Sequence, residues 1–278
     1  MHLLAISIAI AIAWTIRKRK LLSNVNWSRR WYNTLFLFLF PSLLLLTTAL
    51  TILYMGCHGA MLGVKAGSLG CIVSGSLVLL ACSCWLKLAY QGSRSIRQLA
   101  NYRQQTVSNT IARIIDIELP YSAQIGFWNS ELVISSGLLE ILDEAHLSAV
   151  IAHEQAHLHY RDTFWFFWLG WIRSFSFWLP NTETLWQELL LLRELRADRK
   201  AAERADYLLL AESLLALVRA PLQSYQSCQA NLNDAGSDRL SERIDFLLSD
   251  TPVPVSYWRG WNWICLLLIP LLSISLHY

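Results

Sequence analysis

The stretch "AVIAHEQAHLHYRD", residues 149–162, places two histidines and a glutamate inside an apolar run. Its apolar residues recur at helical spacing and Asp143 is suited to cap a first turn, so the sequence predicts one helix here. On a helix, positions i and i+4 lie almost above one another, so His153 and His157 present their rings to the same point. Glu154 lies roughly one-third of a turn away, within reach of a water molecule held at that point.

This H-E-x-x-H spacing fits either satisfied core histidines or two metal ligands beside a general base, so a third ligand is needed to decide. Catalytic zinc usually takes three protein ligands and keeps a fourth position for water. In the predicted helix 184–205, Glu194 is the candidate third ligand, and Asp198 is placed to accept the N–H of a ligating imidazole. The alternative for both carboxylates is an ordinary charged helix face. Against it, they share a face with the apolar residues Leu190, Leu191, Ala201 and Ala202.

Outside this stretch, the composition is that of a membrane protein. Of the 278 residues, 54% are hydrophobic and only 15% are charged, too few charges for an ordinary soluble domain. Residues 35–55 and 71–90 each contain at most one charge and are long enough to cross a bilayer. Residues 3–16 and 261–276 are shorter but uncharged. The sequence therefore predicts four transmembrane helices.

Positive charges predict the orientation of these helices. Lys and Arg cluster at 17–20 and 29–30, whereas the 56–70 loop holds only one Lys. By the positive-inside rule the 17–34 loop is cytoplasmic, which leaves the N-terminus outside. The charges follow the first apolar segment, so this segment is an anchor and not a cleaved signal. The net charge of +3 is explained by these clusters, and no direct nucleic-acid binding is expected.

We therefore predict three parts. Residues 1–90 form a three-helix transmembrane region, 91–258 a cytoplasmic domain, and 259–278 a final transmembrane helix. The six cysteines contain no C-x-x-C pair and are interpreted as small apolar residues. A disulfide between Cys57 and Cys71, which bracket the outward loop, is the less favoured alternative.

Within the cytoplasmic domain, residues 91–115 are polar with scattered apolar positions and predict an amphipathic helix. Residues 121–136 predict a short hairpin that turns at Asn129-Ser130. After the H-E-x-x-H helix, further helices are expected from Thr182 or Thr184, and from about Tyr207 until Pro221 ends the last one.

The segment "LVISSGLLEILDEAHLSAVIAHEQAHLHYRD" and the later "ELRAD" resemble the membrane zinc metallopeptidases of the gluzincin type, which share S-x-G-L-L, H-E-x-x-H and E-x-x-A-D. In the HtpX and CAAX-prenyl-protease branch, two long spanning helices separate the second His from the Glu. Here His157 and Glu194 are 37 positions apart, which fits one segment only. The arrangement more closely resembles the BlaR/MecR antirepressor peptidase family, with three spans, a cytoplasmic zinc domain and a final span.

The intervening apolar segment 163–180 is Trp-rich and contains Arg173. If it crossed the membrane once, Glu194 would lie on the opposite side from the histidines, so the segment is expected in or on the membrane. Antibiotic-sensing relatives carry a penicillin-binding domain after the last span, whereas this sequence ends at Tyr278. β-Lactam sensing by this polypeptide alone is therefore not expected.

The resemblance implies a mainly α membrane protein with a small β-hairpin or sheet, four transmembrane helices and a cytoplasmic gluzincin-like domain. It implies one catalytic zinc ion on His153, His157 and Glu194, with Glu154 as the base. An extended substrate would pair with the edge of the strand formed by Glu131, Leu132, Val133, Ile134 and Ser135. The candidate oxyanion stabilisers, which the sequence does not rank, are His159, Arg161 and Arg196.

The expected partners are the lipid bilayer of the bacterial cytoplasmic membrane and a protein substrate, for which a cytoplasmic repressor is one candidate. The oligomeric state stays open. Two alternatives remain: a quality-control protease of membrane proteins, and a non-catalytic signalling scaffold that zinc only stabilises. Structural zinc sites usually have four ligands, often Cys, and no Cys lies near the two predicted ligand helices, which favours a catalytic site.

Overall fold

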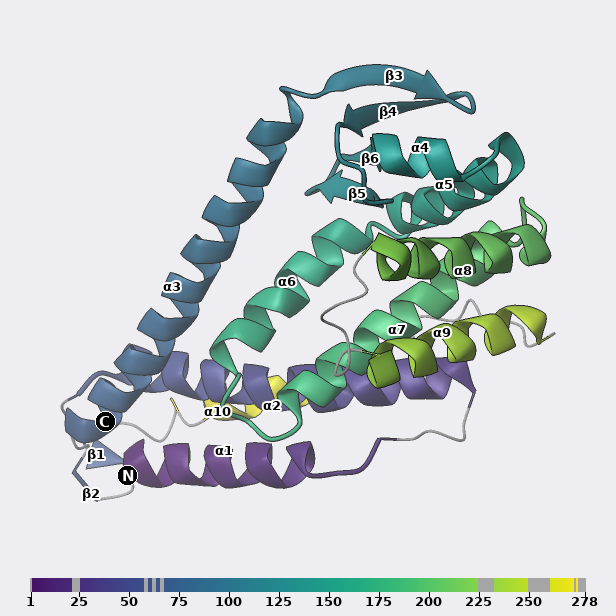
Figure 1. Cartoon of the computed structure of the whole chain (residues 1–278). Helices are drawn as coiled ribbons and strands as arrows, with labels where there is room; N and C mark the ends of the chain where they lie inside the picture. The colour runs from purple at the N-terminus through teal and green to yellow at the C-terminus, as the bar shows by residue number, and fades with distance from the viewer. Residues whose placement is uncertain are drawn as a thin grey trace. The chain divides into compact units, whose positions relative to one another are not determined.

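The computed structural model is mostly helical with a small sheet (Figure 1). It describes residues 2–21, 26–57, 60–61, 64–65, 68–224, 233–249, 261–272 and 274. The chain divides into two compact units, each built from segments that are distant in the sequence. Unit 1 contains residues 1–88, 168–190 and 254–278, and unit 2 contains residues 89–167 and 191–253.

Among the described residues, two helices are long and apolar enough to cross a membrane: α2 (Trp27–Met55) and α3 (Ser68–Leu99). Only 22% of the apolar window of α3 is buried, so most of this apolar surface is exposed, as expected of a helix that contacts lipid. The window of α2 is 72% buried, which a core helix would also show. Helix α1 (His2–Arg17) has 16 residues, fewer than the ~20 that cross a bilayer upright.

The predicted C-terminal helix is not continuous. Residues Trp261–Leu268 form a 3-10 helix, η1, and Ile269–Leu272 form the short helix α10. Pro270 cannot donate the α-helical hydrogen bond to Leu266, which interrupts the helical ladder here. The rest of the predicted helix, at 259–260, 273 and 275–278, lies outside the described residues.

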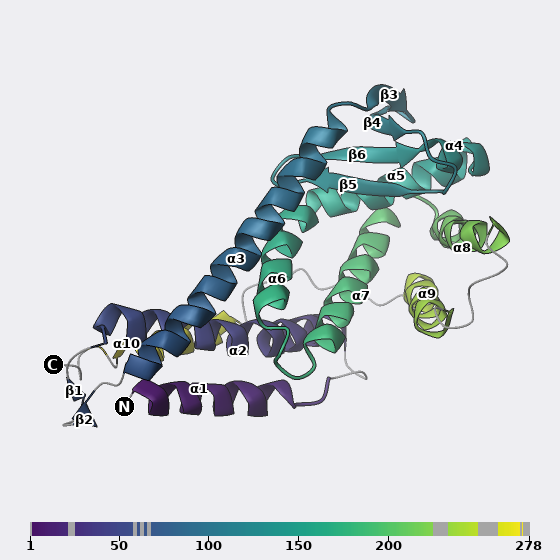
Figure 2. The same ribbon diagram turned by 60° about the vertical axis from the view of Figure 1, so that its left-hand side comes forward.

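Two helices lie between His157 and Glu194: one in the apolar segment 163–180, and the start of the helix that was expected from Thr182 or Thr184. Helix α6 (Asp162–Phe175) is followed by a reversal at 176–181 and by α7 (Thr182–Ala201), as Figure 2 shows. The Thr182 hydroxyl stabilises the reversal by donating to the carbonyls of Ser176 and Leu179, both at 2.9 Å. Because α7 runs antiparallel to α6, the last turns of α7 lie near the start of α6 (Figure 2).

The hairpin corner packs against α1 and α2 within unit 1. Leu179 lies in one apolar cluster with Ala9, Ala13 and Leu45. The Asn181 side-chain amide donates to the carbonyl of Arg17 at 2.9 Å, and Arg30 of α2 forms an ion pair with Glu188 of α7 at 2.7 Å. Residues 168–190 are part of the same unit as α2 and residues 68–88 of α3.

The sheet of unit 2 has four strands in the order β3-β4-β6-β5. Strands β4 and β6 are parallel, and the other two pairs are antiparallel. Helices α4 and α5 cover one face, where Leu138, Leu147, Val150 and Ile151 pack against strand residues (Figure 1). The elements are β3 (Arg103–Val107), β4 (Thr110–Ile115), β5 (Ser122–Gly126), β6 (Ser130–Ser135), α4 (Ser136–Ile141) and α5 (Glu144–His159).

The predicted hairpin at 121–136 is confirmed as β5 and β6, whereas the predicted helix at 91–115 is correct only as far as Leu99. Helix α3 ends at Leu99, and the hairpin of β3 and β4 follows. Ser108 and Asn109 have φ angles of 42° and 62°, which form the tight turn between these strands. The β-branched residues of 106–115 favour strands, and the sheet buries Val107 and Ala112 on the side of α5.

The expectation that Glu131–Ser135 lies at the edge of the sheet is also wrong. Strand β6 is internal, because residues 132–135 pair with β4 and residues 130–134 pair with β5. Strand β5 is the edge on this side of the sheet, as far as the described residues extend. A single-sequence pattern gives strand positions but not their order, so the edge could not be assigned without the sheet.

Helices α8 (Tyr207–Ser224) and α9 (Asn233–Leu248) complete unit 2. Helix α8 begins where predicted but continues beyond Pro221.

In unit 1, the short strands β1 (Ala60–Met61) and β2 (Val64–Lys65) pair between α2 and α3. Cys57 and Cys71, on either side of them, form the disulfide that was the less favoured alternative.

Candidate metal centre

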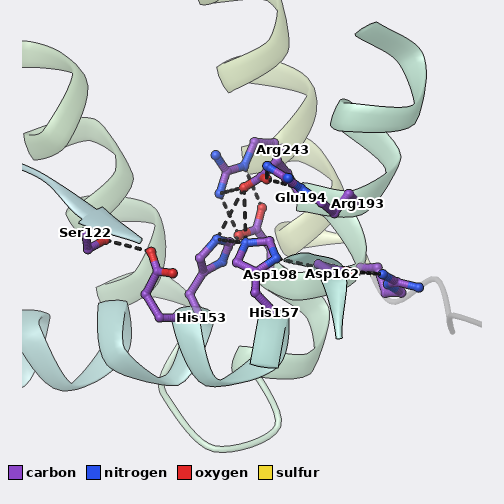
Figure 3. A network of polar contacts seen from close by, with 10 residues as sticks. Ser122, His153, His157, Asp162, Arg193, Glu194, Asp198 and Arg243 are labelled. Atoms are coloured by element: carbon purple, nitrogen blue, oxygen red, sulfur yellow. Dashed lines mark hydrogen bonds and ion pairs between the residues drawn. The ribbon is translucent and has the colours of Figure 1, made fainter. Parts of the chain in front are cut away.

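Three side chains converge between α5 and α7 in unit 2 (Figure 3). The Nε2 atoms of His153 and His157 are 3.0 Å apart, and Oε2 of Glu194 lies 3.3 Å and 3.7 Å from them. One ligand atom from each of the three residues lies within 4.8 Å of the others. The helical i,i+4 spacing brings the two rings together, and the return of α7 brings the carboxylate to them.

The second nitrogen of each imidazole faces a carboxylate. Nδ1 of His153 lies 2.7 Å from Oδ1 of Asp198, and Nδ1 of His157 lies 2.7 Å from Oδ2 of Asp162. Asp198 was predicted for this role from the sequence, whereas Asp162 was missed. Asp162 is five positions after His157, beyond the end of α5, so helical periodicity could not place it. Arg161 adopts a positive φ of 53° and turns the chain so that Asp162 begins α6 beside the ring.

Each carboxylate in turn contacts an arginine. Arg243 binds Asp198 through Nε at 2.7 Å and Nη2 at 2.8 Å, and Arg196 forms an ion pair with Asp162. Arg193 donates to Oε1 of Glu194 at 2.9 Å and 2.6 Å, while Oε2 of that carboxylate faces the imidazoles. Arg193 and Arg243 were not predicted as site residues from the sequence.

These buried charges compensate one another. Burial lowers the pKa of His153, but Asp198 and then Glu194 outweigh it and raise the pKa to about 10. Burial raises the pKa of Glu194, yet hydrogen bonds from the two imidazoles hold it well below its usual value. Burial likewise raises the pKa of Asp198, and Arg243 outweighs it.

This donor set fits a zinc ion. Two imidazole nitrogens and one carboxylate oxygen are the ligands of many catalytic zinc sites, and carboxylate partners behind the rings fix their tautomer and orientation. Asp198 is 0% exposed and both histidines are buried, so the rings are held in place. His153, His157 and Glu194 would hold the ion.

Glu154 lies beside these residues and lines the same pocket, whose volume is about 230 Å³. The hydroxyl of Ser122 on β5 donates to Oε1 of Glu154 at 2.7 Å, a contact that was not predicted from the sequence. Ala123 and Gln124 of β5 also line the pocket. The edge strand therefore runs along the site, which the internal strand β6 does not.

The three oxyanion candidates do not line this pocket. His159 is exposed and lines a separate hollow, Arg161 stacks 3.9 Å from the ring centre of Trp128, and Arg196 contacts Asp162. Among the described residues that line the pocket, the arginine is Arg193.

Residues 117–246 match the model of peptidase family M48. Three relatives, each named Protease HtpX, come from Actinobacillus pleuropneumoniae serotype 5b (strain L20), serotype 3 (strain JL03) and serotype 7 (strain AP76). Each is 30% identical to this chain over 119 residues, which cover 34% of this chain and 41% of the relative. The chain thus spans less than half the length of these relatives. No solved structure matches it.

The comparisons confirm the resemblance to membrane metallopeptidases at the level of an M48 peptidase domain. The matched segment contains the H-E-x-x-H helix, Glu194, both carboxylate partners and all three arginines. These relatives carry the HtpX name, the branch that the sequence placed second to the BlaR/MecR family. The match and the apolar helices together support a membrane metalloprotease.

Proposed function

We propose that this chain is a zinc-dependent membrane endopeptidase that hydrolyses peptide bonds at the cytoplasmic face, because residues 117–246 match the model of peptidase family M48. One observation carries the proposal: the ligand atoms of His153, His157 and Glu194 converge beside a pocket that Glu154 lines. No cysteine is among the described residues that line this pocket, so the site resembles an open catalytic centre more than a closed structural one.

When bound, zinc supplies a Lewis acid that polarises the scissile carbonyl and lowers the pKa of a water molecule. Glu154 accepts a proton from the attacking water and delivers it to the departing amine. The Ser122 hydroxyl holds one oxygen of Glu154 and so orients the base. Asp198 and Asp162 keep each imidazole turned with Nε2 toward the ion.

We propose β5, in place of β6, as the strand that receives the substrate. The N–H of Ser135 donates to the carbonyl of Tyr121 at 2.9 Å, so residues 121, 123 and 125 direct their backbone groups to β6. By alternation, Ser122, Gln124 and Gly126 direct theirs to the open edge. An extended peptide can pair there alongside the candidate zinc ligands.

For the membrane arrangement, we propose four spans in the bacterial cytoplasmic membrane, with the N-terminus outside and the peptidase domain in the cytoplasm. The spans are α1, α2, α3 and the segment 259–278. The positive clusters at 17–20 and 29–30 support this orientation. The disulfide between Cys57 and Cys71 also supports it, because disulfides persist on the oxidising side of the membrane.

For the substrate, we propose regulatory cleavage of a cytoplasmic transcriptional repressor, which rests on the resemblance to the BlaR/MecR family. The similarity to proteins named Protease HtpX favours the alternative, quality-control proteolysis of membrane proteins. The two roles use the same chemistry and differ only in what is cut. A substrate trap separates them: Glu154→Gln is expressed in cells, cross-linked, and its attached proteins are identified. One DNA-binding protein supports the regulatory role, and a broad mixture of membrane proteins supports quality control.

The catalytic role of Glu154 is tested by Glu154→Gln in the purified full-length chain. We expect zinc content to equal that of the wild type, while cleavage of fluorescent β-casein falls by at least about 100-fold because the base is lost. Glu144→Gln, an exposed glutamate on the same helix, is the matched control and should keep full activity. Full activity of Glu154→Gln, or a wild type that binds zinc and cleaves nothing, would favour the zinc-stabilised scaffold.

A further inference from the structure

Arg243 differs from the other two arginines of the site in its origin. Arg193 and Arg196 lie on α7, next to Glu194 in the sequence. Arg243 lies on α9, 45 positions after Asp198, and reaches the site only because α9 docks there. Figure 3 shows its side chain above Asp198 and Glu194. A separate helix therefore contributes to the surroundings of the candidate metal centre.

The contact between Arg243 and Asp198 fixes the carboxylate in its plane. Nε and Nη2 of Arg243 bind the two different oxygens of Asp198, at 2.7 Å and 2.8 Å. One of these oxygens, Oδ1, also lies 2.7 Å from Nδ1 of His153. A planar guanidinium that binds both oxygens prevents rotation of the carboxylate, which a single point charge would permit. The direction of Oδ1, and through it the His153 ring, thus depends on Arg243.

Arg243 also compensates buried negative charge. Asp198 is 0% exposed, and Nη2 of Arg243 lies 3.6 Å from Oε2 of Glu194 as well. A buried carboxylate without a cationic partner is strongly unfavourable. Arg243 therefore lets the fold keep two carboxylates next to the imidazoles.

The position of Arg243 is set by the apolar face of α9. Leu240, Ile244 and Leu247 lie at i−3, i+1 and i+4 from Arg243, on the same side of the helix. Leu247 is 3% exposed, and all three belong to one apolar cluster with Ala149 of α5. The packing that buries this face directs the guanidinium toward Asp198.

From these contacts we infer that Arg243 is a positioning residue of the zinc site, which acts through Asp198 to hold His153 in its ligating orientation. The inference rests on the proposed function. It makes α9 a necessary part of the site, although α9 supplies no ligand.

The test measures the zinc dissociation constant of the full-length chain in detergent, by competition with a chelator. Arg243→Met should bind zinc about ten-fold more weakly, and Asp198→Asn about 10- to 100-fold more weakly, the range for outer partners of ligating histidines. The double variant, which combines Arg243→Met with Asp198→Asn, should bind zinc no more weakly than Asp198→Asn alone, because Arg243 acts through Asp198. Arg243→Lys, which keeps the charge but not the two-pronged contact, should fall between the wild type and Arg243→Met.

Thermal unfolding of the metal-free chain separates positioning from general stability. Arg243→Met should lower the unfolding midpoint, since it removes the guanidinium partner of the buried Asp198 carboxylate. The double variant should recover much of the lost unfolding midpoint, since the Asn side chain introduced at position 198 is neutral. Its zinc affinity should nevertheless stay low. Arg103→Gln, which removes an exposed arginine from unit 2, should change neither quantity.

The absorption spectrum of the cobalt(II)-loaded chain adds a direct readout of ligand geometry. The ligand-field bands should change in Arg243→Met and not in Arg103→Gln. Wild-type zinc affinity and an unchanged cobalt spectrum in Arg243→Met would overturn the inference, as would additive losses in the double variant. A wild type that binds no zinc would instead overturn the proposed function, and the inference with it.

Discussion

At the scale of single residues, the candidate metal centre is organised by alternating charges. A carboxylate lies behind each imidazole, and an arginine lies behind each of those carboxylates. The same principle operates at the surface, where His146 of α5 lies between two carboxylates, 2.7 Å from Asp143 and 3.1 Å from Glu212 of α8. Ion pairs with histidine depend on pH, and this one is far enough from the metal site to be tested alone.

His146 is predicted to stabilise the fold only below a certain pH. Hydrogen bonds with Asp143, and then with Glu212, raise the pKa of His146 above its usual 6.5. Its contribution is therefore complete below about pH 6.5 and is lost as the pH rises through the raised pKa. We expect His146→Gln to cost about 0.5 kcal/mol or less at pH 6, because the pair is exposed, and nothing at pH 9.

The measurement for His146 is the thermal unfolding midpoint at the two pH values, compared with the wild type. His159→Gln removes another exposed histidine of α5, one with no carboxylate contact among the described residues, and is the control. An equal cost of His146→Gln at both pH values would contradict the prediction.

At the scale of elements, the edge position of β5 has a direct consequence. Proline at position 124 removes an N–H that points to the open edge and leaves the pairing with β6 intact. We expect Gln124→Pro to lower kcat/KM by about five- to ten-fold, the effect of one lost hydrogen bond to an extended substrate. The unfolding midpoint should change little.

Gln124→Ala is the control for this variant, because it keeps the N–H and removes only the side chain, which accepts from Ser130 at 2.9 Å. Ala123→Pro should instead destabilise the sheet, since the N–H of residue 123 points to β6. If Gln124→Pro and Gln124→Ala had the same kcat/KM, substrate pairing along β5 would be refuted.

At the scale of the whole molecule, the disulfide and the peptidase domain should lie on opposite sides of the membrane. In intact cells, an impermeant maleimide should label Cys57 and Cys71 only after reduction. Glu140 lies on the exposed side of α4. In a chain whose native cysteines are all replaced, the Glu140→Cys variant should react with the maleimide only after the membrane is permeabilised. Labelling of Glu140→Cys in intact cells would contradict the proposed orientation.

The hairpin of α6 and α7 also belongs to this scale. Residues 168–190 of the hairpin belong to unit 1, whereas Asp162 and Glu194 belong to unit 2. Hydropathy showed that the 163–180 segment is apolar, but it could not show that the chain reverses at 176–181. The reversal depends on contacts such as the one between Asn181 and Arg17, which are distant in the sequence.

The sequence by itself determined what depends on local spacing. The helix that carries His153, Glu154 and His157 follows from i,i+4 periodicity, and the length of apolar runs identified α2 and α3. The inward face of α7 made Glu194 and Asp198 candidates, and the structure brings both to the imidazoles.

Only the tertiary structure decided what depends on contacts between distant segments. Sheet pairing placed β6 inside and β5 at the edge, and strands replaced the part of the expected helix 91–115 that follows Leu99. The turn at Arg161 brought Asp162 to His157, and the docking of α9 brought Arg243 to Asp198. Periodicity reports which face of an element is buried, but not its partner, because the partner is chosen by packing and charge across the whole fold.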